Sequence, residues 1–183
     1  MNRCPPTISQ PAIDPSGPAR QPLSPPIIAL VGASNCGKTT LICRLLARCR
    51  QEGWRVAVIK HTHKIVEPDP PGKDTWRFRQ AGAQVVALAG PGILQVTQTL
   101  MAEPAFDQIL AALPRDLDLI LVEGYKHSNL PKLVFLTPAT AELTKLTQVM
   151  AYISDTPVDT ALPVFGREQV EALWNFLQQW LTH

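Results

Sequence analysis

The sequence predicts an α/β fold: a doubly wound, mostly parallel sheet with helices on both faces and a β-hairpin insertion. Three observations predict it. Short apolar runs end in glycine or an acidic residue, amphipathic stretches alternate with these runs, and two strand-like segments flank a Gly-Pro-Gly turn at 90–92. The 183 residues are enough for one such domain with its own core.

The first 26 residues contain eight of the 18 prolines and little periodic apolar content. Because proline interrupts both helices and strand ladders, we expect a disordered Pro-rich tail over 1–26 and a single domain over 27–183. A tail without a specific role is the simpler interpretation, and a docking segment is the alternative.

The composition is that of an ordinary globular protein, with 45% hydrophobic residues and a net charge of +2. No strong field points to nucleic acid or to a membrane surface. The start lacks an apolar signal core, and no window is long and apolar enough to span a membrane, so we expect a cytoplasmic protein. The four cysteines lack zinc-site spacing. We expect Cys43 and Cys49 to lie on a helix and to pack as small apolar residues.

The first elements form a strand, helix, strand unit. The apolar run 26–32 predicts a strand buried on both faces. Apolar residues at helical spacing predict a helix over 39–50, with Gly53 just beyond its end. A second strand is predicted over 55–60, and because a helix separates the two strands, we expect them to be parallel.

The remaining elements are short and alternate along the chain. We expect helices over 73–80, 104–113 and 167–181, hairpin strands over 84–89 and 93–97, and further strands over 117–123, 132–136 and 148–154.

The segment GASNCGKT at 32–39 fits the pattern GxxxxGK[ST], between a predicted strand and a predicted helix. In such a loop the main-chain N–H groups point at phosphate oxygens, and the helix N-terminus favours the anion. The lysine reaches the β- and γ-phosphates and the threonine hydroxyl binds Mg²⁺. We therefore predict a P-loop NTPase-like fold. The predicted nucleotide contacts in this loop are Gly32, Ser34, Asn35, Cys36, Gly37, Lys38, Thr39 and Thr40.

Glu123 follows four apolar residues at the end of a predicted strand. The carboxyl ends of parallel strands open onto the ligand crevice. We expect Glu123 to hold Mg²⁺ together with Thr39, directly or through water. A solvated carboxylate at a strand end is the alternative.

Residues after the second strand and at the start of the next predicted helix are further candidates for ligand contacts. Lys60, His61 and His63 follow the second strand, and we expect phosphate or substrate contacts from them, since two histidines alone are weak evidence for a metal site. Asp74 is the one candidate for a catalytic role, orienting Mg²⁺-bound water, and capping of the following helix is its alternative.

Asp155 follows the last predicted strand. A carboxylate there can accept hydrogen bonds from guanine N1–H and the exocyclic amine, a donor pair that adenine lacks. The alternative is an aspartate that forms a turn before Pro157.

Together, the blocks GASNCGKTTL, VAVIKHTHK, PPGKDTWRFRQAGA, DLILVEGYKHSNLPKL and ISD resemble the molybdopterin-guanine dinucleotide biosynthesis adapter (MobB) family, over about residues 27–160. The resemblance implies a P-loop GTPase-like fold, GTP and Mg²⁺ as ligands and weak GTP hydrolysis. It also implies a homodimer, a MobA-like guanylyltransferase as partner, and molybdopterin as a further candidate ligand. By position it places Gly37, Lys38 and Thr39 at phosphate and Mg²⁺, Glu123 as the acidic residue, and His61, His63, Lys73 and Asp74 along the ligand crevice.

Two features depart from that family pattern. Asn35 and Cys36 stand where many such loops carry small residues, and Cys36 would make nucleotide binding sensitive to oxidation. The Pro-rich tail is the second departure.

The role of the nucleotide is left open by the residues. No general base or arginine finger can be assigned, so we expect slow hydrolysis without a partner. The alternatives to an adapter are a small-molecule kinase, with His61, His63 and Tyr125 around the acceptor, and a nucleotide-gated interaction module.

The predicted hairpin carries apolar side chains that a monomer would expose. We therefore expect a homodimer that covers them. They are Val85, Val86, Leu88, Leu94 and Val96.

Overall fold

The computed structural model describes residues 24–182, which fall into two compact units. Residues 65–110 form the hairpin unit, and 24–64 with 111–182 form the sheet unit. The expected Pro-rich tail lies outside the described residues as far as residue 23. Pro26, the last residue of the predicted tail and the first of the predicted strand, belongs to the fold, because its carbonyl accepts a hydrogen bond from the Ile120 N–H (2.9 Å).

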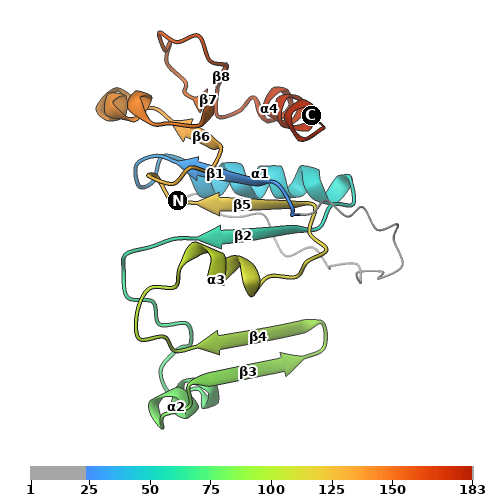
Figure 1. Ribbon diagram of the computed structural model, residues 1–183, viewed down its shortest axis with the longest axis vertical. Helices are drawn as coiled ribbons and strands as arrows, with labels where there is room; N and C mark the ends of the chain where they lie inside the picture. The colour runs from blue at the N-terminus through green and yellow to red at the C-terminus, as the bar shows by residue number, and fades with distance from the viewer. Residues whose placement is uncertain (1–23, 183) are drawn as a thin grey trace. The chain divides into compact units, whose positions relative to one another are not determined.

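Six parallel strands form the sheet unit in the order β2-β5-β1-β6-β7-β8 (Figure 1). Their bounds are β1 Ile27–Val31, β2 Val56–Lys60, β5 Leu119–Glu123, β6 Lys132–Phe135, β7 Val149–Ile153 and β8 Val164–Phe165. The first two strands are parallel, as expected, but β5 lies between them. All six carboxyl ends therefore lie along one edge of the sheet, the edge at which open α/β folds bind ligands.

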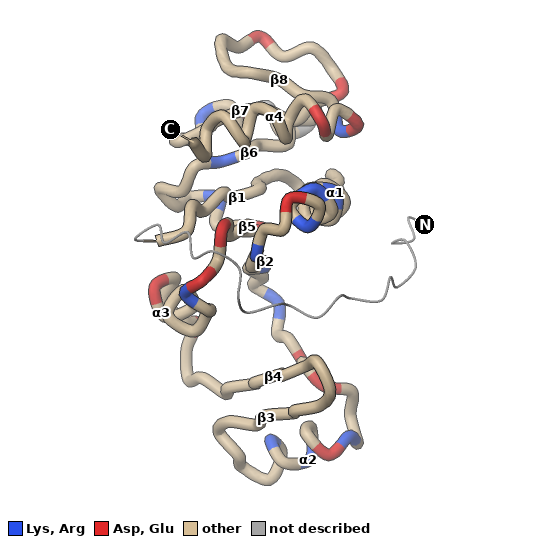
Figure 2. The backbone as a smooth tube through the Cα atoms, turned by 90° about the vertical axis from the view of Figure 1, so that its right-hand side faces the viewer, with Lys and Arg blue, Asp and Glu red and all other residues tan. Residues whose placement is uncertain are grey.

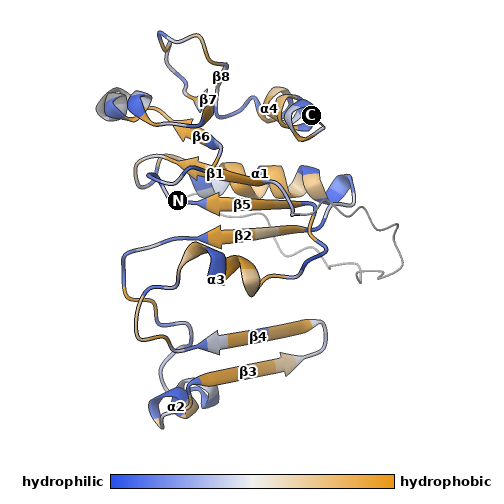
Figure 3. Ribbon diagram, in the orientation of Figure 1, coloured by the Kyte–Doolittle hydropathy of each residue, from blue (hydrophilic) through white to orange (hydrophobic). Residues whose placement is uncertain are grey.

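Helices cover both faces of this sheet, as predicted. On one face, α1 (Lys38–Gln51) and α4 (Val170–Leu181) pack against alternate residues of the strands. On the other, the 3-10 helix η1 (Pro138–Lys145) packs Leu143 against β6 and β7. Figure 3 shows the central strands as the most apolar segments of this unit, in keeping with burial on both faces.

The apolar stripe of α1 explains how the first helix docks. Leu41, Leu45 and Cys49 recur at a spacing of four residues and are buried. Burial raises the pKa of the Cys49 thiol to about 11, so this cysteine packs as a small apolar residue. The same expectation for Cys43 is wrong: two positions from both Leu41 and Leu45, it falls on the opposite, exposed face.

Lys132 is fully buried in β6. Its ammonium donates hydrogen bonds to the carbonyls of Ser128 (2.5 Å), Leu130 (2.8 Å) and Thr147 (3.2 Å). Desolvation lowers its pKa. Two of these carbonyls belong to the loop between β5 and β6, so the buried lysine fixes the loop that follows Glu123.

In the hairpin unit, β3 (Val85–Gly90) and β4 (Ile93–Gln98) pair antiparallel, as predicted, and α2 (Asp74–Gln80) contacts β3. Gly90 pairs with Ile93, which leaves Pro91 and Gly92 as the turn. Gly92 has a φ of 72°, a conformation that glycine adopts without strain. The helix α3 (Phe106–Ala111) begins at the end of this unit and is shorter than the predicted helix over 104–113.

Two elements differ from the sequence prediction near the C-terminal end. The last helix begins at Val170 instead of residue 167, because Gly166 and Arg167 donate main-chain hydrogen bonds to the side chains of Gln169 and Asp155. The strand β8 and the helix η1 were not predicted. A strand of two residues shows no alternation, and a 3-10 helix lacks the apolar period of an α-helix.

The core position of Leu45 generates a stability prediction. Leu45→Ala should lower the free energy of unfolding by about 3 kcal/mol, because it leaves a cavity between α1 and the sheet. Chemical denaturation followed by circular dichroism measures this. Arg50→Ala, an exposed change on the same helix, should stay within about 0.5 kcal/mol of the parent. Equal effects of the two changes would contradict the packing described here.

Candidate nucleotide-binding site

The predicted phosphate-binding loop joins β1 to α1. Gly37 is the N-cap of α1, with a φ of 101° that favours glycine. The first main-chain bond of the helix runs from Leu41 N–H to the Gly37 carbonyl (3.0 Å). The N–H groups of residues 38–40 therefore precede that first bond and require another acceptor, which an anion can provide.

Close packing and backbone conformation account for the other residues of this loop. A Cβ on Gly32 would lie 2.7 Å from Phe135 Cβ and 2.9 Å from Cys36 Sγ, so a larger residue does not fit there. Asn35 has a φ of 60°, and asparagine is among the few residues other than glycine that adopt this conformation readily. The departure at Asn35 and Cys36 thus preserves the loop, with Cys36 buried beside Gly32.

The Lys38 ammonium lies inside the loop. It donates hydrogen bonds to the carbonyls of Gly32 (3.1 Å) and Ala33 (2.6 Å), and lies 3.7 Å from Cys36 Sγ. Ser34, Asn35, Thr39 and Thr40 are exposed along the same turn. The lysine charge and the exposed turn are thus on one short segment at the carboxyl edge of the sheet.

Thr39, Glu123 and Lys60 converge at the ends of α1, β5 and β2. Thr39 Oγ1 donates a hydrogen bond to Glu123 Oε2 (2.9 Å), and Lys60 Nζ lies 3.4 Å from Glu123 Oε1. The Glu123 side chain is 14% exposed. The structure thus brings together Thr39 and Glu123, the two residues predicted to hold Mg²⁺. It also pairs Lys60 with the carboxylate of Glu123. Phosphate contact by Lys60 stays a prediction.

This pair of oxygens fits Mg²⁺. A hydroxyl and a carboxylate are hard oxygen donors, which Mg²⁺ prefers. The hydrogen bond of 2.9 Å between Thr39 Oγ1 and Glu123 Oε2 shows that the two oxygens lie next to each other, so both would be available to hold the ion. The remaining positions would be taken by water and phosphate, since Mg²⁺ keeps several of its waters.

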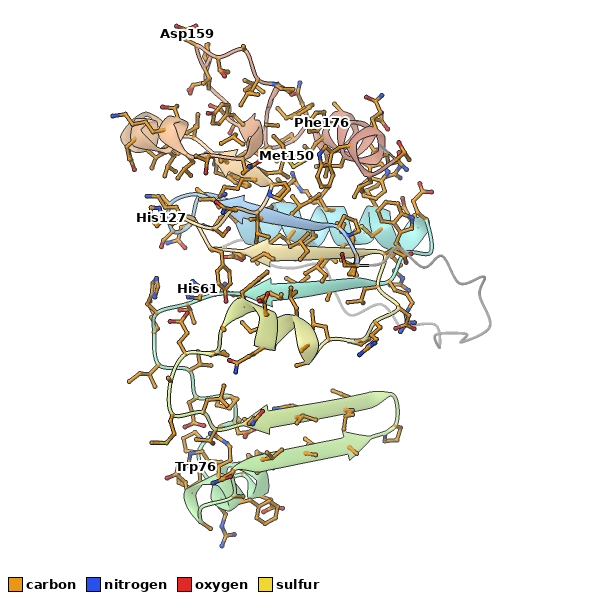
Figure 4. The ribbon with its side chains drawn as sticks, in the orientation of Figure 1. His61, Trp76, His127, Met150, Asp159 and Phe176 are labelled. Atoms are coloured by element: carbon orange, nitrogen blue, oxygen red, sulfur yellow. The ribbon has the colours of Figure 1, made fainter. Side chains whose placement is uncertain are left out.

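Three rings cluster beside Glu123. The ring of His61, at the end of β2, lies 4.6 Å from the ring of His63 and 4.6 Å from that of Tyr125. Figure 4 shows His61 at the end of its strand, on the edge of the sheet where His127 also lies. Tyr125 has a φ of 52° and follows Gly124, whose Cβ would lie 3.0 Å from His61 Cβ. The sequence prediction of His61 and His63 at the carboxyl edge therefore holds for their position, and their contacts with a ligand stay a prediction.

Asp155 lies just beyond the end of β7, beside the end of β8. Its Oδ1 accepts a hydrogen bond from the Arg167 main-chain N–H (2.9 Å), and its Oδ2 lies 3.1 Å from Arg167 Nε. Arg167 was predicted only as the start of a helix, so sequence reasoning missed its contact with Asp155. No local signal could have found it, because a strand of two residues shows no alternation.

Asp74 belongs to the hairpin unit, where it is the first residue of α2. Lys73 is the N-cap, and the cap has no side-chain hydrogen bond. Asp74 therefore does not cap the helix in the strict sense, but its charge in the first turn is favourable to the helix dipole. The role of Asp74 toward Mg²⁺-bound water stays a prediction.

Among the described residues, no helix is both long and apolar enough to cross a membrane.

The chain matches known proteins along most of its length. The family model described as molybdopterin guanine dinucleotide synthesis protein B matches residues 27–155. The molybdopterin-guanine dinucleotide biosynthesis adapter protein of Escherichia coli is 34% identical, over 85% of this chain and 93% of that protein. The protein of the same name from Haemophilus influenzae is 30% identical, over 86% of this chain and 90% of that protein.

A solved structure agrees with the fold. The crystal structure of Bacillus subtilis MobB aligns with a TM-score of 0.70 and 31% identity, covering 84% of this chain and 97% of that one. The matched residues include the P-loop, the end of β5 that carries Glu123, and Asp155. The chain therefore belongs to the family of molybdopterin guanine dinucleotide synthesis protein B, MobB.

Proposed function

We propose that this chain binds GTP with Mg²⁺ and serves as an adapter for a MobA-like guanylyltransferase in molybdopterin-guanine dinucleotide synthesis. The observation that carries the proposal is the 2.9 Å contact between Thr39 Oγ1 and Glu123 Oε2 at the N-terminus of α1. It sets a pair of oxygens suited to Mg²⁺ beside a loop whose N–H groups can accept an anion as their hydrogen-bond partner. A triphosphate with its Mg²⁺ satisfies both.

Guanine is the proposed base because of where Asp155 lies. The strand β7 is two strands away from β1, with β6 between them. At about 4.8 Å between neighbouring strands, the ends of β1 and β7 are about 10 Å apart. A base whose phosphates occupy the P-loop can therefore reach Asp155. A carboxylate there accepts from guanine N1–H and the exocyclic amine.

The adapter role rests on the relatives, two of which are named as biosynthesis adapter proteins. A guanylyltransferase consumes a guanine nucleotide, and this chain would bind and present one. The two carboxylates described at the site are both engaged, Glu123 by Thr39 and Lys60 and Asp155 by Arg167. With both carboxylates engaged in this way and no general base assigned, slow GTP hydrolysis at most is expected. Direct contact with molybdopterin, and a cytoplasmic location, stay predictions.

A homodimer through the hairpin unit is part of the proposal. By the strand register, Val85, Leu94 and Val96 share one face of the two-stranded sheet, and they are 55–69% exposed. Leu88 and Ile93 lie on the opposite face together with Val86, which is buried, so the expectation that a monomer would expose Val86 is wrong. The exposed apolar face that carries Val85, Leu94 and Val96 favours association, and the same face of a second copy would cover it.

A small-molecule kinase is the second candidate function. The rings of His61, His63 and Tyr125 lie beside Glu123, where an acceptor next to the γ-phosphate would bind. The fate of the γ-phosphate separates the candidates: free phosphate for a GTPase, a phosphorylated acceptor for a kinase, and intact GTP for a binding module.

Mg²⁺ dependence tests the proposed metal site. Mg²⁺ should strengthen GTP binding by the parent protein, and Glu123→Gln should reduce that gain about tenfold, because the loss of a charged ligand is worth at least ~1.4 kcal/mol. Calorimetric titration of GTP with Mg²⁺ and with EDTA measures both values. Glu52→Gln, an exposed change at the other end of α1, is the control and should leave the gain intact. An unchanged Mg²⁺ gain in the Glu123 variant would refute the site.

Base preference tests the assignment of Asp155. Asp155→Asn should weaken GTP binding about tenfold and strengthen binding of xanthosine triphosphate, because the amide offers a donor to the xanthine oxygen. Binding of ATP should change little. The same titrations measure all three nucleotides, and an equal loss for GTP and ATP would mean that Asp155 does not contact the base.

The oligomeric state tests the role of the hairpin. Light scattering at micromolar concentration should give twice the mass of one chain. Val96→Lys should give a single-chain mass, because a charge would then be buried at the interface. Gln80→Lys, at an exposed position of α2 outside both strands, introduces the same charge and should leave the dimer intact. A single-chain mass for the parent protein would exclude this dimer.

A further inference from the structure

The main chain holds Arg167 beside Asp155. Their segments follow β7 and β8, which stay in register through a hydrogen bond from the Ser154 N–H to the Phe165 carbonyl (2.9 Å). The Arg167 N–H then donates to Asp155 Oδ1 (2.9 Å). The main-chain N–H of Arg167 thus orients the carboxylate of Asp155 independently of the Arg167 guanidinium.

Arg167 also lies against the phosphate-binding loop. A Cβ on Gly37 would be 3.8 Å from Arg167 Cδ. The Arg167 carbonyl accepts a hydrogen bond from Arg44 Nη1 of α1 (3.1 Å), and Arg44 also pairs with Glu168 (2.9 Å). The basic residues along α1 are visible in Figure 2. The Arg167 side chain is therefore at the base end of the proposed site, between the P-loop and Asp155.

The guanidinium of Arg167 has N–H donors that the described residues do not fully use. Its Nε is 3.1 Å from Asp155 Oδ2 but makes no well-aligned hydrogen bond with any described residue, and this nitrogen is shielded from solvent. A guanidinium carries five N–H donors. The side chains of Asp155 and Arg167 are 55% and 41% exposed, and such an exposed pair adds little to stability. The pair is therefore not needed for folding, and its remaining donors are open to a ligand.

The chemistry of the pair matches one base edge. Guanine presents an acceptor, O6, beside two donors, N1–H and the exocyclic amine. Asp155 supplies acceptors and Arg167 supplies donors, side by side. Adenine presents an amine donor where guanine has O6 and an acceptor at N1, so both contacts would be mismatched with adenine, and leaving polar groups unpaired is costly.

We propose that Asp155 and Arg167 read the Watson–Crick edge of guanine as a pair, with Arg167 donating to O6 while Asp155 accepts from N1–H and the amine. This inference rests on the proposed binding of a guanine nucleotide. It makes Arg167 a specificity-determining residue of the same site. Two other roles are distinguishable: Arg167 as a competitor that masks Asp155, and Arg167 as a contact for phosphate.

Nucleotide analogues test the pair. The parent protein and Arg167→Ala are titrated with the triphosphates of guanosine, inosine, 2-aminopurine riboside and adenosine, each with Mg²⁺. Inosine keeps O6 and N1–H but lacks the amine, and 2-aminopurine lacks O6. Arg167→Ala should weaken GTP and inosine triphosphate about tenfold, the loss of one charged hydrogen bond, and change the other two less than about twofold.

The controls separate recognition from folding. Arg167→Ala keeps the main-chain N–H that orients Asp155, and thermal denaturation checks that the variant is folded. Arg167→Lys retains a cationic donor and should recover part of the GTP affinity. Arg44→Ala removes the neighbouring guanidinium, which contacts the Arg167 carbonyl and Glu168, and should not alter the preference among bases.

Each contrary outcome has a distinct meaning. Tighter GTP binding by Arg167→Ala would identify a competitor, and an equal loss for all four nucleotides would identify a phosphate contact; either result overturns the pair. If the parent protein prefers GTP and Asp155→Asn removes that preference while Arg167→Ala leaves it, the pair fails and the proposed function stands. If the parent protein shows no preference for GTP over ATP, guanine binding fails and the pair fails with it.

Discussion

The candidate site depends on the parallel register of β1, β5 and β2. Leu30 of β1 lies level with Glu123, and Lys60 of β2 lies level with Glu123 on the other side. Because parallel strands end at the same edge, this register brings the carboxylate to the first turn of α1, where Thr39 contacts it. A shift of one residue in β5 would turn the carboxylate to the opposite face of the sheet.

The loop beyond Glu123 is held by a buried charge, the ammonium of Lys132, whose desolvation is unfavourable. Lys132 is a charged residue at a position where β6 is otherwise apolar, and its burial is unfavourable enough to lower its pKa. Three carbonyl contacts offset this penalty, and two of them order the loop that begins at Gly124. We read the buried lysine as a structural support for the end of β5, since its ammonium makes its hydrogen bonds within the loop and strand ends.

Local sequence patterns predicted most of the fold and the loop at 32–39 between β1 and α1, because both depend on short-range features. The pattern at 32–39 specifies its own backbone, and the apolar runs specify the central strands. The position of β5 between β1 and β2 is a long-range pairing, which no local pattern specifies. Arg167 was missed for the same reason: its contact with Asp155 joins the ends of β7 and β8, and β8 is too short to show a period.

The two ends of the proposed nucleotide site differ in what recognises the ligand. In the proposal, main-chain N–H groups and one lysine would serve the phosphate end, with chemistry common to many nucleotides. Side chains after β7 and β8 would serve the base end, so selectivity among bases would reside there. Arg44 and Arg48 of α1 pair with Glu168 and Glu171, which join the base end to the helix of the phosphate end. Because these pairs are exposed, they add little to stability, and their effect is to connect α1 with the start of α4 next to Arg167.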